Sequence, residues 1–192
     1  MTTYRQEMGR KAIHLGSAVF PISYWFIPRE IFLPIIIVLA VITIAADYGR
    51  HHINWLNRAF DAVFGNVLRE NEDETFTGGS SVMLSQIIIV AIFPKPIAIA
   101  ALLTLSIGDS AAALVGKAIG KNKLFRDKTF EGGLAFLVGS SIVASLVPGI
   151  PVYAAIIASL VAAIVEVYVN ILDDNLLIPL ASGSTLFLLM MI

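Results

Sequence analysis

Apolar residues run through this sequence in long blocks, separated by short polar or proline-containing segments. Each block holds about 16 to 22 residues, enough for a helix that crosses a hydrocarbon core of roughly 30 Å. The blocks do not alternate between apolar and polar residues, as the strands of a membrane β-barrel do. The pattern therefore predicts about seven transmembrane helices, over residues 10–27, 31–48, 79–94, 96–118, 132–148, 151–171 and 175–192.

The segment after the second block has a different pattern. Apolar residues such as Trp55, Phe60 and Phe64 recur there at helical spacing, whereas Arg58 and Arg69 take other positions. A helix with one apolar and one basic face is typical of the membrane interface. We predict an interfacial amphipathic helix here, and favour a simple anchor over a gate for lipid.

The composition agrees with a membrane protein. Of the 192 residues, 57% are hydrophobic and only 14% are charged, and the mean hydropathy is +0.84. A soluble domain of this size needs more polar surface. There is no cysteine, which excludes disulfides and thiolate chemistry. We predict an all-α integral membrane protein that forms a single domain over residues 1–192.

Basic residues are distributed unevenly among the predicted connections. With the N-terminus in the cytoplasm, seven spans place every one of the 13 lysines and arginines except Arg29 and Lys95 on the cytoplasmic side. This distribution follows the positive-inside rule, so we predict a cytoplasmic N-terminus.

Polar residues within or beside the apolar blocks gather on this same predicted side, whereas Glu30 is on the other. A charged group in the membrane costs about 2.5–3.5 kcal/mol on insertion scales and usually faces a partner or a water-filled cavity. We therefore predict a shared cavity that opens to the cytoplasm. The residues concerned are His14, Asp47, Asp109, Ser110, Glu131, Glu166, Asn170, Asp173, Asp174 and Asn175.

The stretch "IGDSAAALVG" at 107–116 carries the strongest candidate. Asp109 is about 12 Å of helix away from Lys117, well below the interface. A carboxylate at that depth can bind Mg²⁺, act as a general base, or pair with a cation such as Lys11. A row of small residues predicts close helix packing here. It consists of Gly108, Ala112, Gly116 and Gly120.

Lys11 and His14 lie three residues apart in "GRKAIHLGS" and so share a helix face. Lys11 could equally extend to lipid phosphates at the interface. His14 lies one turn deeper, where it could serve a reaction or bond to a neighbouring helix. The sequence favours a functional role for His14 only slightly.

The connection "KNKLFRDKTFEGG" has the charge to attract phosphate, with Lys117 just before it. Thr129 can cap the helix that follows, and a helix N-terminus next to glycine can bind an anion. Glu131 would repel that anion unless Lys128 or a metal lies between them. The pattern predicts a metal–phosphate site.

Two other polar stretches allow more than one interpretation. "TGGSS" at 77–81 permits either close helix packing or the approach of backbone to a phosphate. Near the C-terminus, Glu166 is followed by Asp173, Asp174 and Asn175. Carboxylates beside an amide suit Mg²⁺, and this stretch has more acidic residues than a helix cap requires.

Four stretches, in this order, resemble the family of dolichol kinases, phytol kinases and CTP-dependent diacylglycerol kinases. They are "RKAIHLGS", "GDSAAALVGKAIGK", "KTFEGGLAF" and "DDNLLIPLASG", and the resemblance covers nearly the whole chain. It implies transfer of the γ-phosphoryl group of a nucleoside triphosphate, often CTP, to the hydroxyl of a membrane lipid alcohol. It also implies a divalent metal, usually Mg²⁺. The acceptor would be polyprenol-, dolichol-, phytol- or diacylglycerol-like.

This resemblance, with the needs of phosphoryl transfer, gives each candidate a role. The catalytic candidates are Asp109, His14, Lys128 and Glu131. The metal candidates are Asp109, Glu131, Asp173, Asp174 and Asn175. The nucleotide and phosphate candidates are Lys11, Ser110, Gly116, Lys117, Gly120, Lys121, Lys123, Lys128, Thr129 and Gly132.

Two other functions use similar ingredients. A phosphatidate cytidylyltransferase would transfer a nucleotidyl group from CTP in place of a phosphoryl group. A carrier would use the buried acids as an ion path, but carriers place polar residues on both sides of the midplane. Nothing indicates nucleic-acid binding, and a homo-oligomer is compatible with the sequence.

Overall fold

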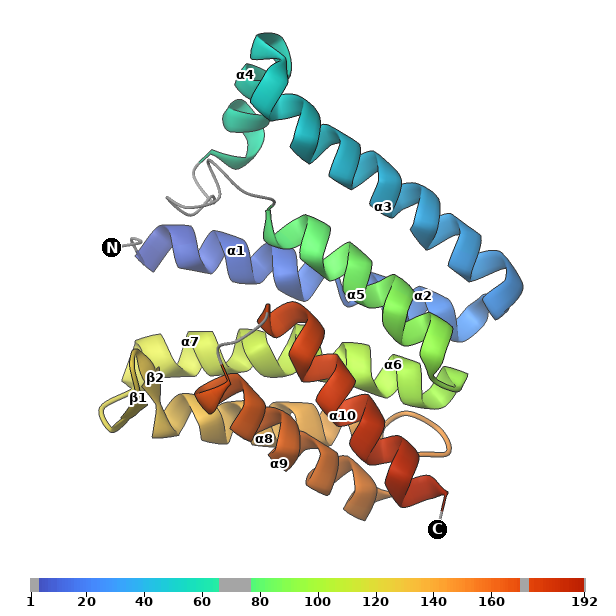
Figure 1. Ribbon diagram of the computed structural model, residues 1–192. Coiled ribbons are helices and arrows are strands. Elements are labelled where there is room, and N and C mark those ends of the chain that lie inside the picture. Colours follow the sequence, from blue (N-terminus) through green and yellow to red (C-terminus); the bar gives the residue numbers. More distant parts are fainter. Residues whose placement is uncertain (1–3, 66–76, 170–172, 192) are drawn as a thin grey trace.

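The computed structural model describes residues 4–65, 77–169 and 173–191, so Arg69 and Asn170 lie outside the described residues. The described chain is helical apart from one short hairpin (Figure 1). Its elements are α1 (Tyr4–Gly16), α2 (Val19–Phe26), α3 (Arg29–His52), α4 (Asn54–Phe64), α5 (Gly78–Ile92), α6 (Lys95–Leu103), the π-helical turn η1 (Thr104–Gly108), α7 (Asp109–Ile119), β1 (Lys123–Phe125), β2 (Lys128–Thr129), α8 (Phe130–Ser145), α9 (Val152–Tyr168) and α10 (Asp174–Met190).

Two of these helices are long and apolar enough to cross a membrane. They are α3 and the continuous helix Lys95–Ile119, which comprises α6, η1 and α7. In the most apolar part of each helix, the buried share is 22% for α3 and 78% for Lys95–Ile119. Figure 1 accordingly shows α3 at one edge and α6 to α7 across the centre. The prediction of an all-helical chain is confirmed. Helices α5, α8, α9 and α10 are also apolar, but they are shorter than the two membrane-length helices.

The prediction of one continuous helix over 10–27 is wrong, because the chain breaks at Ser17 and Ala18 between α1 and α2. Pro21 is the physical reason, since it has no N–H to donate to the carbonyl of Ser17 four residues earlier. The N–H of Phe20 donates to that carbonyl instead, at 3.1 Å. The Ser17 hydroxyl donates to the carbonyl of His14 at 2.6 Å, which also satisfies a carbonyl at the end of α1.

The predicted row of small residues lies where α7 packs against α8. A Cβ atom added to Gly132 would lie 2.9 Å from the carbonyl oxygen of Ala112 and 3.4 Å from the Cα of Gly116. A Cβ added to Gly108 would lie 3.0 Å from the Phe136 ring. Glycine therefore allows this close approach of the two helices.

Asp47 joins the end of α3 to the start of α5 and explains the "TGGSS" stretch. Its Oδ2 accepts hydrogen bonds from the Thr77 N–H at 2.6 Å, the Thr77 hydroxyl at 2.9 Å and the Ser80 hydroxyl at 2.8 Å. Its Oδ1 accepts from Arg50 Nε at 2.8 Å. The anion at this helix N-terminus is a carboxylate of the protein itself. Thr77 and Ser80 thus bind a carboxylate of the protein, and a Cβ on Gly79 would meet only the Thr77 hydroxyl at 3.5 Å, so close helix packing is not what Gly79 provides.

The predicted amphipathic segment forms helix α4, which follows the end of α3 (Figure 1). Trp55 on this helix is 67% exposed, as an anchor in an interface requires. The Arg50 guanidinium lies 5.0 Å from the centre of the Phe60 ring and so connects α4 to the Asp47 contacts.

Candidate active site

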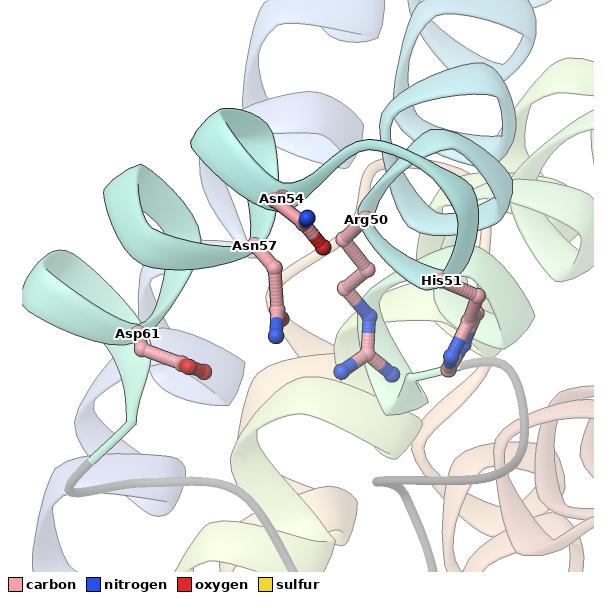
Figure 2. Close-up of a pocket in the computed structure, with 5 residues that line it drawn as sticks. All are labelled: Arg50, His51, Asn54, Asn57 and Asp61. Carbon is pink, nitrogen blue, oxygen red and sulfur yellow. The ribbon is translucent and has the colours of Figure 1, made fainter.

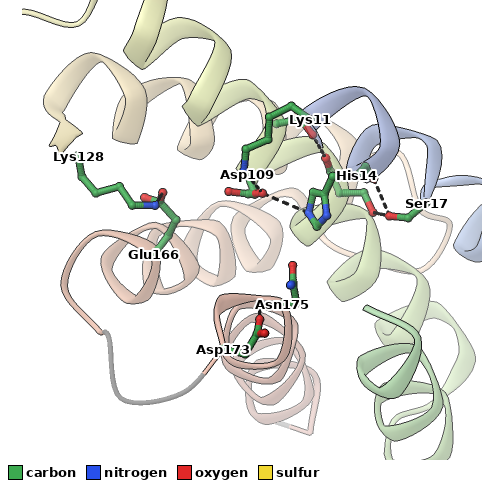
Figure 3. A network of polar contacts seen from close by, with 10 residues as sticks. Lys11, His14, Ser17, Asp109, Lys128, Glu166, Asp173 and Asn175 are labelled. Atoms are coloured by element: carbon green, nitrogen blue, oxygen red, sulfur yellow. Dashed lines mark hydrogen bonds and ion pairs between the residues drawn. The ribbon is translucent and has the colours of Figure 1, made fainter. Parts of the chain in front are cut away.

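Lys11 and His14 of α1 meet Asp109 at the start of α7 (Figure 3). Lys11 Nζ lies 2.5 Å from Asp109 Oδ2, and His14 Nε2 lies 3.2 Å from the same oxygen. Asp109 is buried, with 8% of its surface exposed. The spacing of Lys11 and His14 predicts that they share one helix face. This face is directed at Asp109, the strongest candidate of the sequence.

The His14 ring nitrogen is close to Asp109 without a hydrogen bond. Nε2 is buried, and its contact with Asp109 does not have hydrogen-bond geometry. Either atom could accept a proton from a substrate, because a carboxylate oxygen and a neutral imidazole nitrogen are both acceptors. The pair is chemically suited to receive a proton.

The π-helical turn η1 fixes where Asp109 begins α7. Turns of this kind are rare and occur often at functional sites. The Ser106 hydroxyl of η1 lies 2.9 Å from the Ser17 hydroxyl at the break between α1 and α2. This contact attaches η1 to the end of α1 and so aligns Lys11 and His14 with Asp109.

Lys128 lies on the two-stranded hairpin and pairs with Glu166 of α9. Figure 3 shows the two side chains meeting beside the Asp109 group. Burial opposes the charge of Lys128, but the Glu166 carboxylate raises the pKa of Lys128 above its usual value. Lys128 is therefore a cation across the physiological pH range.

The two ion pairs belong to one cluster. Asp109 interacts electrostatically with Lys128 as well as with Lys11 and His14. Asp174 at the start of α10 interacts with Lys128, Asp109 and Glu166. The residues of this cluster thus come from α1, α7, the hairpin, α9 and α10, so part of the predicted polar set converges, whereas Asp47 lies at the α3–α5 junction and Glu131 at the base of the hairpin.

The other residues at the start of α10 have more local roles. Asp173 is exposed, and its Oδ1 accepts a hydrogen bond from the Asn175 N–H at 2.8 Å, so it caps α10. The Asn175 side chain is directed toward the side of the cluster that holds His14 (Figure 3).

Thr129 caps α8 as the sequence predicts, because its Oγ1 accepts a hydrogen bond from the Gly132 N–H at 3.2 Å. The same Oγ1 would lie 3.1 Å from a Cβ on Gly116 and 2.7 Å from one on Gly120. These three glycines therefore leave room for Thr129 and for neighbouring backbone. Packing accounts for them without a phosphate.

Glu131 lies apart from the Asp109 cluster in its contacts. Glu131 is half-buried, and its carboxylate accepts a hydrogen bond from Asn122 Nδ2 at 2.8 Å. Its own backbone N–H and those of neighbouring residues lower the pKa of Glu131. In the structure Glu131 holds the base of the hairpin.

The remaining phosphate candidates divide into two groups. Lys117, Lys121 and Lys123 are exposed at the end of α7 and on the hairpin, where a soluble anion can reach them. Ser110 is buried, and its hydroxyl donates to the carbonyl of Ser106 at 2.6 Å. Its hydroxyl proton is thus used within the helix.

The predicted metal ligands do not form a ready metal site. Within residues 4–65, 77–169 and 173–191, no group of three or more histidines and acids is placed to hold an ion. Asp109 pairs with Lys11, Glu131 binds Asn122, and Asp173 caps α10. The donor set therefore does not fit a resident Mg²⁺.

A second polar region lies at the junction of α3 and α4 and contains none of the predicted site residues. It is a pocket of about 460 Å³ on the polar side of α4 (Figure 2). The side chains around it belong to Arg50, His51, Asn54, Asn57 and Asp61. Arg50 donates a hydrogen bond to Asp47, so this pocket lies beside the contact between α3 and α5.

Sequence reasoning placed Glu166 and Asp47 in the predicted cavity, and Glu166 near a possible Mg²⁺ site, but it named no partner for either residue. Both are single acids near the end of a long apolar helix, and both are almost fully buried. The cost of placing a charge there was the available signal that each has a partner. The identity of the partner depends on which helices become neighbours.

Several known proteins are similar to this chain. It is 32% identical to an uncharacterized protein of Rickettsia prowazekii over 185 residues, which cover 91% of this chain and 90% of that protein. It is 28% identical over 208 aligned positions to CTP-dependent diacylglycerol kinase 1 of Schizosaccharomyces pombe, covering 97% and 94% of the two chains. It is 30% identical over 141 residues to CTP-dependent diacylglycerol kinase 1 of Eremothecium gossypii, covering 70% and 44%.

No protein-family model matches the chain, and no solved structure matches it. The two relatives with a stated activity are lipid kinases. The chain belongs to the family that includes the CTP-dependent diacylglycerol kinases. This membership confirms the resemblance that the four sequence motifs predict.

Proposed function

We propose that this protein is a membrane lipid kinase that transfers the γ-phosphoryl group of CTP to the hydroxyl of a lipid alcohol. The observation that carries the proposal is the cluster of Lys11, His14 and Asp109, in a chain related to CTP-dependent diacylglycerol kinases. Diacylglycerol is the first acceptor to test, because the relatives are named for it. Polyprenol, dolichol and phytol are further acceptors.

The reaction takes place at the cytoplasmic membrane face, within a single domain of seven spans. Two observations support this arrangement. The basic residues fall almost entirely on one predicted side, which follows the positive-inside rule. The surface of α3 is largely apolar and exposed, as lipid contact requires. Helix α4 then lies in the interface as an anchor.

The chemical step uses the Asp109–His14 pair and two lysines. The lipid hydroxyl oxygen forms a bond to the γ-phosphorus, the bond from that phosphorus to the β-bridging oxygen breaks, and CDP leaves. The hydroxyl proton passes to the Asp109–His14 pair, whose two acceptor atoms face one another at 3.2 Å. Lys11 and Lys128 stabilise the charge on the transferred group.

Exposed lysines guide the nucleotide to this cluster. Lys117, Lys121 and Lys123 lie in water near the hairpin and attract the triphosphate. Mg²⁺ enters this proposal only as an ion that arrives with the phosphates, because the described acids do not form a resident site. Its chemistry there is to neutralise phosphate charge.

A panel of acceptors tests the proposed function. The purified protein is placed in bilayers that contain diacylglycerol, a polyprenol or phytol, and CTP is added with Mg²⁺. We expect a phosphorylated lipid from at least one acceptor, detected by mass spectrometry. The absence of any phosphorylated lipid with CTP or ATP contradicts the proposal.

A further inference from the structure

We propose that Glu166 is a positioning residue that holds the Lys128 ammonium where the triphosphate of the nucleotide binds. This inference rests on the proposed function for the identity of the nucleotide. Glu166 belongs to α9, and Lys128 belongs to the hairpin 38 residues earlier in the chain. Their ion pair is the contact that brings these two elements together at the cluster.

The two partners differ sharply in exposure. The Lys128 side chain is 38% exposed, whereas the Glu166 side chain is 3% exposed. Lys128 is therefore the partner that a phosphate arriving from water can reach, whereas Glu166 is enclosed. Glu166 reaches the nucleotide through Lys128 and does not touch it.

Glu131 and Thr129 hold the base of the hairpin, and its two strands are short. Strand β2 comprises only Lys128 and Thr129, and the pairing with β1 is irregular. Residues Lys123 to Phe125 are exposed. A second contact with α9 is made by the rings of Phe125 and Tyr168, whose centres lie 6.0 Å apart. The last turn of α9 thus holds the hairpin at two points, and of these two contacts only the Glu166 ion pair acts on the ammonium.

Glu166 also determines which acid Lys128 pairs with. Asp109 and Asp174 both attract Lys128, and Asp109 already binds Lys11. Without the Glu166 charge, Lys128 would move toward these two acids and away from the position that faces water. The buried Glu166 carboxylate therefore keeps the two lysines on separate acids.

The test compares three variants, Glu166→Gln, Lys128→Met and the double variant. We expect Glu166→Gln to raise the KM for CTP and its directly measured dissociation constant about tenfold, with a change in kcat below about threefold. Lys128→Met should show at least the same loss. The double variant should match Lys128→Met, because Glu166 acts only through Lys128.

Two results would overturn the inference. One is an unchanged CTP affinity in Glu166→Gln, and the other is a double variant whose loss is the product of the two single losses. Asp127→Asn is the matched control, because it makes the same change from acid to amide on an exposed residue of the same hairpin. It should leave CTP affinity unchanged.

A second readout separates this inference from the kinase proposal. Hydrogen exchange of the amides in 122–130 should be faster in Glu166→Gln, with the rest of the bundle unchanged, whether or not any lipid is phosphorylated. Unchanged exchange in the hairpin contradicts the inference. If Glu166→Gln does not fold, Glu166→Asp keeps the charge, and a CTP affinity unaffected by this shorter side chain would contradict the inference.

Discussion

Asp109 is the residue on which the proposed chemistry depends. Its carboxylate accepts a hydrogen bond from the Lys11 ammonium and lies close to His14. Its position at the start of α7 is fixed by the π-helical turn before it. A buried carboxylate between two cationic or protonatable groups is placed to receive charge during a reaction. A purely structural ion pair would need only Lys11.

Asp109→Asn should keep the fold and lower kcat about 10²–10⁴-fold, which is the range for loss of a positioned proton acceptor. The amide has the same shape and still accepts a hydrogen bond from Lys11, but it cannot share a proton with His14. The measurement is kcat for lipid phosphorylation, with circular dichroism to check the fold. Activity within threefold of the wild-type protein would remove Asp109 from the mechanism.

At the scale of helices, one close contact sets the geometry of the site and a second joins two helices away from it. Backbones of α7 and α8 approach at Gly132 and Gly116, which positions Asp109 relative to the hairpin. The Asp47 carboxylate joins α3 to α5. Each contact depends on one residue type, so a single substitution can test it.

Gly132→Ala should destabilise the protein by about 1–3 kcal/mol, because its Cβ would press on backbone atoms that cannot give way. Gly133→Ala is the matched control one position later, since its Cβ would meet only Val167 at 3.7 Å. That substitution should be neutral or slightly stabilising. Thermal unfolding in detergent measures both, and equal stabilities would contradict the packing argument.

Asp47→Ala should lower the free energy of unfolding by about 3–5 kcal/mol, because it removes an ion-pair partner of the buried Arg50 and the acceptor of the Thr77 and Ser80 donors. Asp61→Ala on the exposed face of α4 should change it by no more than about 0.5 kcal/mol. Denaturant unfolding compares the two. A small effect at Asp47 would show that the α3–α5 junction does not depend on it.

For the whole molecule, the sequence predicts the helices and much of the cluster. Hydrophobic block length finds the helices, and the cost of a charge in an apolar helix finds Asp109. The possible Lys11–Asp109 pair and the Thr129 cap follow from local spacing and depth, and both are present.

Other features depend on which helix faces meet, and the pattern within one helix does not contain that information. The Lys128–Glu166 pair and the use of "TGGSS" by Asp47 belong to this group. The break at Ser17 and Ala18 carried a local signal in Pro21, but it does not interrupt the run of apolar residues. Long-range packing therefore decides the parts of the site that the sequence left open.

The membrane topology can be tested directly, because the chain contains no cysteine. Single cysteines at Lys123 and Glu30 occupy exposed positions on the hairpin and at the start of α3. We expect an impermeant thiol reagent to label the Lys123 position only from the cytoplasmic side and the Glu30 position only from the other. Labelling of both from one side would contradict the predicted orientation.

The most direct test of the central claim follows the position of a label during transfer from CTP. Purified protein in diacylglycerol-containing bilayers is given CTP labelled in either the γ- or the α-phosphate. The proposed kinase predicts label in the lipid from γ-labelled CTP alone, with Asp109→Asn as the inactive control. Label in the lipid from α-labelled CTP would contradict it and identify a cytidylyltransferase.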